Sequence, residues 1–337
     1  MLAGVASVAN GQTPATDRQR FAGEIEVSRV LLDARVLTRR GQPVLGLQPG
    51  DFTVRIDNTL VPVESVAWVS GEPAPAEVPG PAQGATGDAP AGVPGRLVVL
   101  FFQCDFQHAR LTGLFRIAPK ARELVASLRP QDRVAVLSFD SHLKLQLDFT
   151  NDRAALARIL TPTALLRDPP LPPPGPFPSL ARGFDTAAAR RAASPEAGLL
   201  VTARALEQLP GPKTVVLFGW GLGHMAGRAG VRADASYGPA RRALTHARVA
   251  VFSLDITDAD YHTLEVGLER VAEDTGGFYV KTHLFPDTAI ARMEGALSGY
   301  YVLTIQKPSA PHGLHAVAVG LTHEHGAQVL AKNSFQD

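Results

Sequence analysis

The sequence predicts an α/β fold in which a doubly wound, mostly parallel sheet carries flanking helices and a small β-sandwich-like domain is attached. The apolar runs 97–102 and 133–139 lack polar alternation, which is typical of parallel strands buried on both faces. Segments with helical spacing recur between such runs. Both ends of the chain show β patterns instead, which favours a second sheet domain built from the N- and C-terminal segments.

Residues 1–24 precede the first strand pattern. The stretch 2–9 is small and apolar and the polar stretch 10–20 follows it, an order typical of the end of a signal peptide. No basic region precedes the apolar stretch, so we interpret it as the remnant of a signal whose start lies upstream. The protein is therefore predicted to be exported to the periplasm, the cell surface or the medium; the alternative is a disordered tail.

Residues 25–70 are expected to form the N-terminal β segment. Apolar and polar residues alternate over 52–56, and Asp57–Asn58 marks a turn after them. These strands are too few to close a core alone. Residues 71–95 are rich in Pro, Gly and Ala with almost no bulky apolar side chain, which predicts a flexible linker.

Residues 96–298 are predicted to form the α/β domain, in which strands alternate with helices. The segment 143–149 alternates and follows a short turn, so it is expected to be an antiparallel edge strand. A Pro-rich loop at 168–183 interrupts the pattern. The remaining strands are expected at 213–218, 248–255 and 277–281, and the helices at 112–128, 151–160, 239–246, 261–275 and 286–297.

Residues 299–337 return to a β pattern, with strands expected at 301–305 and 316–321 and a weaker one at 328–331. Because a β segment lies on each side of the α/β region, we expect the two segments to pair in one small sandwich. The α/β domain would then be inserted between strands of that sandwich.

Composition excludes several classes of function. The formal net charge is +1 and there is no run of basic residues, so nucleic-acid binding is not expected. The single cysteine, Cys104, excludes an internal disulfide and any site with several cysteine ligands, and it is expected to be a buried apolar side chain. No apolar stretch is long enough to predict a membrane span.

Several motifs occur in the order found in a known bacterial family. They are GLQPGDFTVRIDN (46–58), LRPQDRVAVLSFD (128–140), LDFTNDRAAL (147–156), ARVAVFSLDITD (247–258), LERVAEDTGGFYV (268–280) and SGYYVLTIQKP (298–308). On these motifs the chain resembles the VWFA-related proteins, best known from Acidobacteria, which contain a von Willebrand factor type A (vWA) domain. The resemblance implies a vWA fold that acts by binding.

The resemblance also implies a metal-ion-dependent adhesion site at the carboxyl edge of the sheet, where open α/β sheets bind ligands. Such a site has an Asp-x-Ser-x-Ser run after the first strand, a Thr at a helix start and an Asp after the fourth strand. Mg²⁺ prefers these hard oxygen ligands in an octahedron. The three ligand positions of the run and the second Asp position fall on Gln103, Asp105, Gln107 and Trp220, the last between Gly219 and Gly221.

These positions predict a degraded adhesion site. An amide replaces the first carboxylate, and an indole, which cannot ligate a cation, replaces the second. Thr186 is the best match to the middle Thr, and Thr202 is the second. We expect no metal ion and no other cofactor, with Mg²⁺ at Asp105 as the alternative.

Other candidate sites are weaker. The four histidines between 312 and 325 suggest zinc, but they surround predicted turns without an obvious further ligand, so solvated loop histidines are the preferred interpretation. Asp140–Ser141–His142 has residue types suited to hydrolysis, but neighbours in a turn are not expected to point at one another. The glycines of 219–223 lack the Lys-Ser/Thr of a phosphate-binding loop.

The predicted function is therefore a non-enzymatic vWA-type binding or adhesion module. It would recognise a protein or glycan, without a metal ion, through the loops 103–107, 169–186, 219–223 and 255–260. The candidate binding residues are Gln103, Asp105, Gln107, Thr186, Gly219, Trp220, Gly221, Asp255 and Asp258. Two alternatives stay open: a structural scaffold in an envelope assembly, and metal-dependent adhesion through a divergent site around Asp105.

Overall fold

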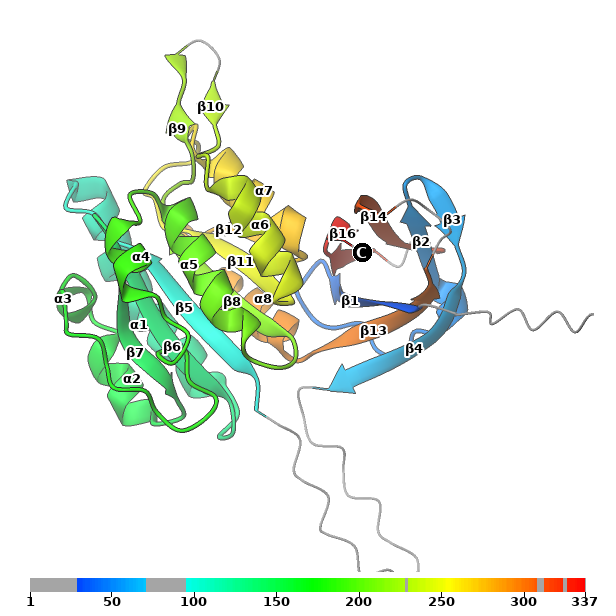
Figure 1. The fold of residues 1–337 in the computed structure, drawn as a ribbon, viewed down its shortest axis with the longest axis horizontal. Coiled ribbons are helices and arrows are strands. Elements are labelled where there is room, and N and C mark those ends of the chain that lie inside the picture. Colours follow the sequence, from blue (N-terminus) through cyan, green and yellow to red (C-terminus); the bar gives the residue numbers. More distant parts are fainter. Residues whose placement is uncertain (1–28, 71–94, 228–229, 308–311, 324–325, 337) are drawn as a thin grey trace, which may run out of the picture.

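Two domains lie side by side in the structure (Figure 1), a computed structural model. It describes residues 29–70, 95–227, 230–307, 312–323 and 326–336. The predictions for residues 1–24 and for most of the linker 71–95 lie outside these ranges. Within the described ranges, no helix combines the length and the apolar character that crossing a membrane requires.

The larger domain is built on a six-stranded sheet with the order β12-β11-β8-β5-β6-β7. Its strands are β5 (Leu97–Gln103), β6 (Arg133–Phe139), β7 (Leu143–Thr150), β8 (Lys213–Gly219), β11 (Val249–Asp255) and β12 (Tyr279–Lys281). β7 pairs antiparallel with β6, and the other pairings are parallel. The order is that of a doubly wound sheet. The predicted sheet and its antiparallel edge strand are therefore confirmed.

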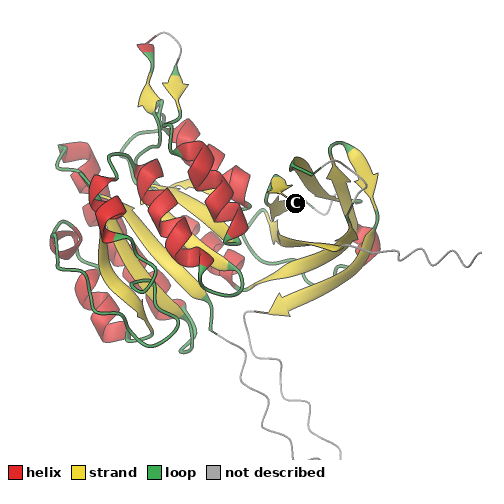
Figure 2. Ribbon diagram, viewed as in Figure 1, coloured by secondary structure: helices red, strands yellow, loops and turns green. Residues whose placement is uncertain are grey.

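Helices cover both faces of this sheet (Figure 2). Val98, Leu100 and Phe102 of β5 point to one face, and Val99 and Phe101 point to the other, because side chains alternate along a strand. The first face is covered by α1 (His108–Ser127), α2 (Arg153–Ile159), α3 (Pro162–Leu165) and α8 (Pro286–Leu297). The second is covered by α4 (Thr186–Arg191), α5 (Pro195–Glu207), α6 (Tyr237–His246) and α7 (Glu265–Thr275).

The helices depart from the sequence prediction at several places: α1 begins at His108 and not at residue 112, and α3 and α4 were not predicted. α7 begins at Glu265 and not at residue 261, because residues 261–264 belong to the loop after β11. α5 was not predicted at all. It begins after Ser194, whose hydroxyl accepts the backbone N–H of Ala197, and Pro195 occupies the first helical position.

The smaller domain consists of two four-stranded sheets, β15-β1-β13-β4 and β16-β14-β2-β3. The N-terminal segment supplies β1 (Arg29–Thr38), β2 (Phe52–Ile56), β3 (Thr59–Val61) and β4 (Val63–Ser70). The C-terminal segment supplies β13 (Gly299–Gln306), β14 (Leu314–Leu321), β15 (Ala327–Ala331) and β16 (Ser334–Gln336). β1 pairs with β13 and β15, and β14 pairs with β2. Both ends of the chain thus share each sheet, as predicted, with the α/β domain inserted between them.

His315 corrects one expectation about the C-terminal histidines. It is buried on β14, its Nδ1 lies 2.7 Å from Asp57 Oδ2, and its ring stacks on Phe335. The interpretation as a solvated loop histidine is therefore wrong here, because β14 packs between β16 and β2. His312 and His323 are exposed, and residue 325 lies outside the described ranges.

Candidate binding site at the carboxyl edge

Five parallel strands place their carboxyl ends at one edge of the large sheet, and one of them, β6, ends at Phe139. β5 ends at Gln103, β8 at Gly219, β11 at Asp255 and β12 at Lys281. Gly219 and Asp255 are partners in the register of β8 and β11. We call the loops that follow β5, β8, β11 and β12 the carboxyl rim, defined as residues 103–110, 219–225, 255–265 and 282–285.

Gln103 fastens the loop after β8 to the end of β5. Its side chain is buried, and its Oε1 accepts the backbone N–H groups of Trp220 and Gly221 at 2.8 and 3.2 Å. Its Nε2 donates to the carbonyl oxygen of Gly221 at 2.7 Å. Only an amide can both accept and donate in this way, since a carboxylate only accepts. A Cβ at Gly219 would lie 2.4 Å from Gln103 Oε1, so this contact requires glycine there.

Asp105 is held by groups of its own loop and of α1. Its Oδ1 accepts the backbone N–H of Gln107 at 2.9 Å, and its Oδ2 forms an ion pair with Arg110 in the first turn of α1. Burial raises the pKa of the Asp105 carboxyl, but the bonds from Gln107 and Arg110 outweigh it and hold that pKa below its ordinary value. The Arg110 guanidinium lies 3.5 Å from the centroid of the Trp220 ring, a cation–π contact. Trp220 is therefore half-buried under Arg110.

This group of residues does not fit a divalent cation. Mg²⁺ takes hard oxygen ligands in near-octahedral geometry. Both polar atoms of the Gln103 amide are already bonded to backbone, and Trp220 offers no oxygen. The charge beside Asp105 is the Arg110 guanidinium, which repels a divalent ion at the same carboxylate.

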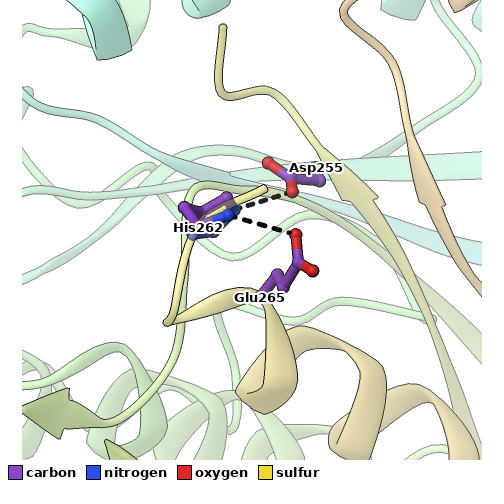
Figure 3. Close-up of side chains that lie close together, drawn as sticks. All are labelled: Asp255, His262 and Glu265. Atoms are coloured by element: carbon purple, nitrogen blue, oxygen red, sulfur yellow. Dashed lines mark hydrogen bonds and ion pairs between the residues drawn. The ribbon is translucent and has the colours of Figure 1, made fainter. Parts of the chain in front are cut away.

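A second polar cluster surrounds Asp255 (Figure 3). Oδ2 of this buried carboxylate lies 2.8 Å from both His262 Nε2 and the Tyr279 hydroxyl. Glu265 Oε2 lies 2.7 Å from Lys281 Nζ and 3.3 Å from the same hydroxyl. Burial, and next the Asp255 charge, raise the pKa of Tyr279, so its hydroxyl stays a hydrogen-bond donor.

Asp255, His262 and Glu265 are the described side chains with the best spacing for a metal ion, because their ligand atoms lie within 4.8 Å of one another. Lys281 and Tyr279 already supply a positive charge and a donor to the two carboxylates. The cluster is thus a closed network that joins the ends of β11 and β12 to α7.

Two predicted site residues lie on the rim outside both clusters. Asp258 Oδ1 lies 3.0 Å from Arg116 Nη1, so this acid ties the loop after β11 to α1. Gln107 is exposed at the N-cap of α1, and its side chain makes no capping hydrogen bond. Both side chains remain accessible from solvent at the rim.

The Pro-rich loop runs away from the rim, contrary to expectation. Near the end of β7, Asp148 accepts the backbone N–H groups of Gly175 and Leu180 at 3.1 and 2.6 Å. Because β7 is antiparallel, its end lies toward the amino ends of the other strands, and Asp148 holds the loop there. Gly183 then packs against the last turn of α5, so Thr186 begins α4 away from the rim.

The residues 140–142 also require a correction. Ser141 Oγ lies 3.1 Å from both Asp140 Oδ1 and His142 Nδ1, and His142 Nε2 lies 3.5 Å from Asp168 Oδ1. The expectation that these neighbours do not point at one another was therefore wrong, because the tight turn folds their side chains together. Asp140 is also bonded to Lys144 Nζ at 2.5 Å, so its carboxylate balances that ammonium.

Large apolar side chains are exposed on the rim. Phe106 after β5 is 71% exposed, and Tyr261 after β11 and Phe285 after β12 are each 69% exposed. Met225 is exposed on the small hairpin of β9 (His224–Met225) and β10 (Val231–Arg232), which projects from the domain (Figure 1). Exposed aromatic side chains on adjacent loops are typical anchors of binding interfaces.

Sequence reasoning missed several members of these clusters. His262 and Glu265 are three residues apart, a spacing that often brings side chains together and could have been noticed. Arg110 stands five residues after Asp105 but carries no local signal that it reaches Trp220. Tyr279 likewise carries none, because it reaches Asp255 from another strand.

No protein-family model and no curated protein matches the chain. Among solved structures it is similar to a von Willebrand factor type A protein from Catenulispora acidiphila (11% identity, TM-score 0.42, 86% of this chain and 73% of that chain). It is also similar to the manganese-loaded TRAP protein of Plasmodium vivax (11%, 0.40, 71% and 93%) and to an aerotolerance-related membrane protein of Bacteroides fragilis (14%, 0.39, 60% and 98%). By its own strand order and antiparallel edge strand, the chain has a vWA-like fold.

Proposed function

We propose that this chain is a binding module without catalytic activity, whose carboxyl rim holds a protein or glycan without a bridging metal ion. The Asp105–Arg110–Trp220 group is the observation that carries the proposal. Asp105 and the Trp220 ring fix the Arg110 guanidinium, whose side chain is 26% exposed. A fixed guanidinium binds a carboxylate or hydroxyl oxygen of a partner directly, in the role that a cation has in a metal-dependent site.

The exposed aromatic side chains of the rim support the same proposal. Phe106, Tyr261 and Phe285 stand on three different rim loops. Burial of such aromatic anchors in a surface that also carries charged groups is typical of specific interfaces. The apolar stretch at 2–9 favours an exported protein, so we place the partner outside the cytoplasm.

Calorimetry with Mg²⁺, Mn²⁺ and Ca²⁺ tests the metal-independent part of the proposal. We expect no binding heat, because the Gln103 amide is already bonded to backbone groups and the Arg110 guanidinium already pairs with Asp105. The Asp105→Ala variant is the control. Micromolar binding that disappears in this variant would show that Asp105 ligates a cation and would contradict the proposal.

Site-specific photo-crosslinking tests the location of the partner. A photoreactive phenylalanine analogue is placed at Phe106, at Tyr261 or, as a control on the smaller domain, at Leu60, which is 61% exposed. Both rim positions are expected to capture one common partner, and Arg110→Ala is expected to abolish the capture. Equal capture from Leu60, or no capture from the rim, would favour a structural scaffold instead.

A further inference from the structure

A cleft of about 750 Å³ lies between the two domains. Its walls come from α5 and α6 of the α/β domain and from β16 and the start of β14 of the smaller domain. Arg204 and His246, in the last turns of α5 and α6, line it. Because these helix ends precede β8 and β11, the cleft lies at the opposite edge of the sheet from the carboxyl rim.

Positive charge dominates the lining of this cleft. Its positively charged side chains are Arg204, Arg241, Arg242, Arg248 and Lys332, and its negatively charged side chain is Glu207. His246 also lines it. Within the part of the chain that the structure describes, the first three arginines make no side-chain hydrogen bond or ion pair. Their charge is therefore available to a ligand.

The other two cations are partly engaged. Arg248 forms a bidentate pair with Asp33 of β1, with Nη2–Oδ1 and Nε–Oδ2 distances of 2.7 and 3.2 Å. Lys332 is half-buried, and burial lowers the pKa of its ammonium; Arg248 also lowers it, while Asp33 opposes them. An anion beside Lys332 would offset the cost of that buried charge.

We propose that this cleft binds an acidic peptide segment of a partner protein. Guanidinium groups form strong paired hydrogen bonds with carboxylates. In the same lining, Leu200, Pro239 and the exposed Leu314 offer apolar surface, which fits a segment that alternates acidic with apolar side chains.

Two other anionic ligands fit the cleft less well. Inorganic phosphate would leave most of the volume and all of the apolar wall unfilled. Single-stranded nucleic acid binds through aromatic side chains on which bases stack. Among Phe, Tyr and Trp, the lining contains Phe335, which is buried against His315 and offers no open face of that kind.

Fluorescence anisotropy of a short labelled peptide that alternates Glu with Leu tests this assignment on the full chain. The cleft variant is Arg204→Ser/Arg241→Ser/Arg242→Ser, and the matched control is Arg122→Ser/Arg158→Ser/Arg190→Ser on exposed arginines elsewhere. Each variant lowers the formal net charge by three, from +1 to −2. We expect binding about tenfold weaker for the cleft variant and nearly unchanged for the control, with affinity falling as salt rises.

Three results would overturn the proposal. An equal loss of affinity in the control would show that only net charge matters. Failure of the unaltered chain to bind the peptide, or tighter binding of single-stranded DNA or phosphate, would reject the ligand class.

Thermal unfolding of both variants checks that they fold. Leu314→Glu gives a second test, since it places an acid in the cleft and should also weaken binding. Leu60→Ser, at an exposed position outside the cleft and outside the rim, should leave peptide binding unchanged.

Discussion

Gln103 differs from an aspartate at the same position chiefly in being able to donate a hydrogen bond. That ability lets it satisfy the carbonyl oxygen of Gly221 as well as two backbone N–H groups. A metal ion in a vWA-type site instead relies on carboxylate and hydroxyl oxygens. The amide at the end of β5 thus fixes the loop that carries Trp220.

The Gln103→Leu substitution tests this clasp. We expect it to lower the free energy of unfolding by about 2–4 kcal/mol, because several backbone groups of the loop lose their partner in a buried place. Urea unfolding gives the measurement. Gln208→Leu, at an exposed position at the end of α5, is the control and should change stability by less than about 0.5 kcal/mol. Equal stability of the two variants would refute the role of the amide.

Cys104 gives a second prediction at the same scale. Its thiol is 4% exposed, and burial, with the Asp140 charge as the next cause, raises its pKa to about 12. The thiolate is the reactive form, so the native protein should resist iodoacetamide at pH 8. Mass spectrometry should find one added group per chain after unfolding, since the sequence has one cysteine. Modification of the native protein at the rate of the unfolded chain would contradict the buried placement.

At the scale of elements, the direction of β7 decides where the Pro-rich loop lies. Asp148 near the end of this antiparallel strand binds Gly175 and Leu180 through their backbone N–H groups and Ser179 through its hydroxyl at 2.6 Å. One buried carboxylate thereby accepts several hydrogen bonds from a segment that forms no helix or strand. The loop is consequently held at the amino edge, away from the rim loops after β5, β8, β11 and β12.

Asp148→Ala should release this loop. The expected result is tryptic cleavage after Arg182 at least about tenfold faster than in the unaltered protein, because the loop loses its common acceptor. Asp152→Ala is a matched control. Its carboxylate caps α2 by accepting the N–H groups of Ala154 and Ala155, so its loss should cost about 1 kcal/mol without exposing Arg182. Unchanged cleavage in Asp148→Ala would show that the loop is held by other contacts.

For the whole molecule, the entry and the exit of the inserted domain are fastened together. Arg96, just before β5, forms an ion pair with the buried Asp132 and donates to the carbonyl oxygen of Leu297 at the end of α8. Arg129 also binds Asp132, with a Nη2–Oδ1 distance of 2.9 Å. Burial raises the pKa of Asp132, but the hydrogen bonds from the two arginines outweigh it and lower that pKa.

The Asp132→Asn variant should lose about 3–5 kcal/mol of unfolding free energy near neutral pH, because two guanidinium groups lose their partner in a buried place. A carboxyl with a lowered folded pKa stabilises the fold above its unfolded pKa of about 3.9, and this contribution is lost as the pH falls through the folded value. The difference between the two proteins should therefore shrink below about pH 4. Urea unfolding from pH 6 to pH 3 measures it, and a difference that does not depend on pH would contradict the ion pair.

Much of the fold could be predicted because burial of a strand or helix determines which residue types occur along that segment. A parallel strand covered on both faces has to be apolar throughout, so 97–102 and 133–139 were recognisable, and the alternation in 143–149 indicated an edge strand. α5 was missed although Ser194 and Pro195 form a start signal, because the neighbouring Pro-rich loop obscured its pattern. Exposure of Phe106 and Tyr261 could not be predicted, since nothing local distinguishes an exposed aromatic side chain from a buried one.

By itself the sequence indicated the strands of the large sheet, most of its long helices, the pairing of the two ends of the chain and the residue types at the ends of the central strands. Only the tertiary structure decided that Arg110 covers Trp220, that His262 and Tyr279 meet at Asp255, and that three arginines face a cleft between domains. The physical reason is the separation along the chain between the residues that interact. Strand and helix patterns arise from each segment's own contact with the core, whereas these contacts join side chains from separate loops, whose positions follow only when the sheet and both domains have assembled.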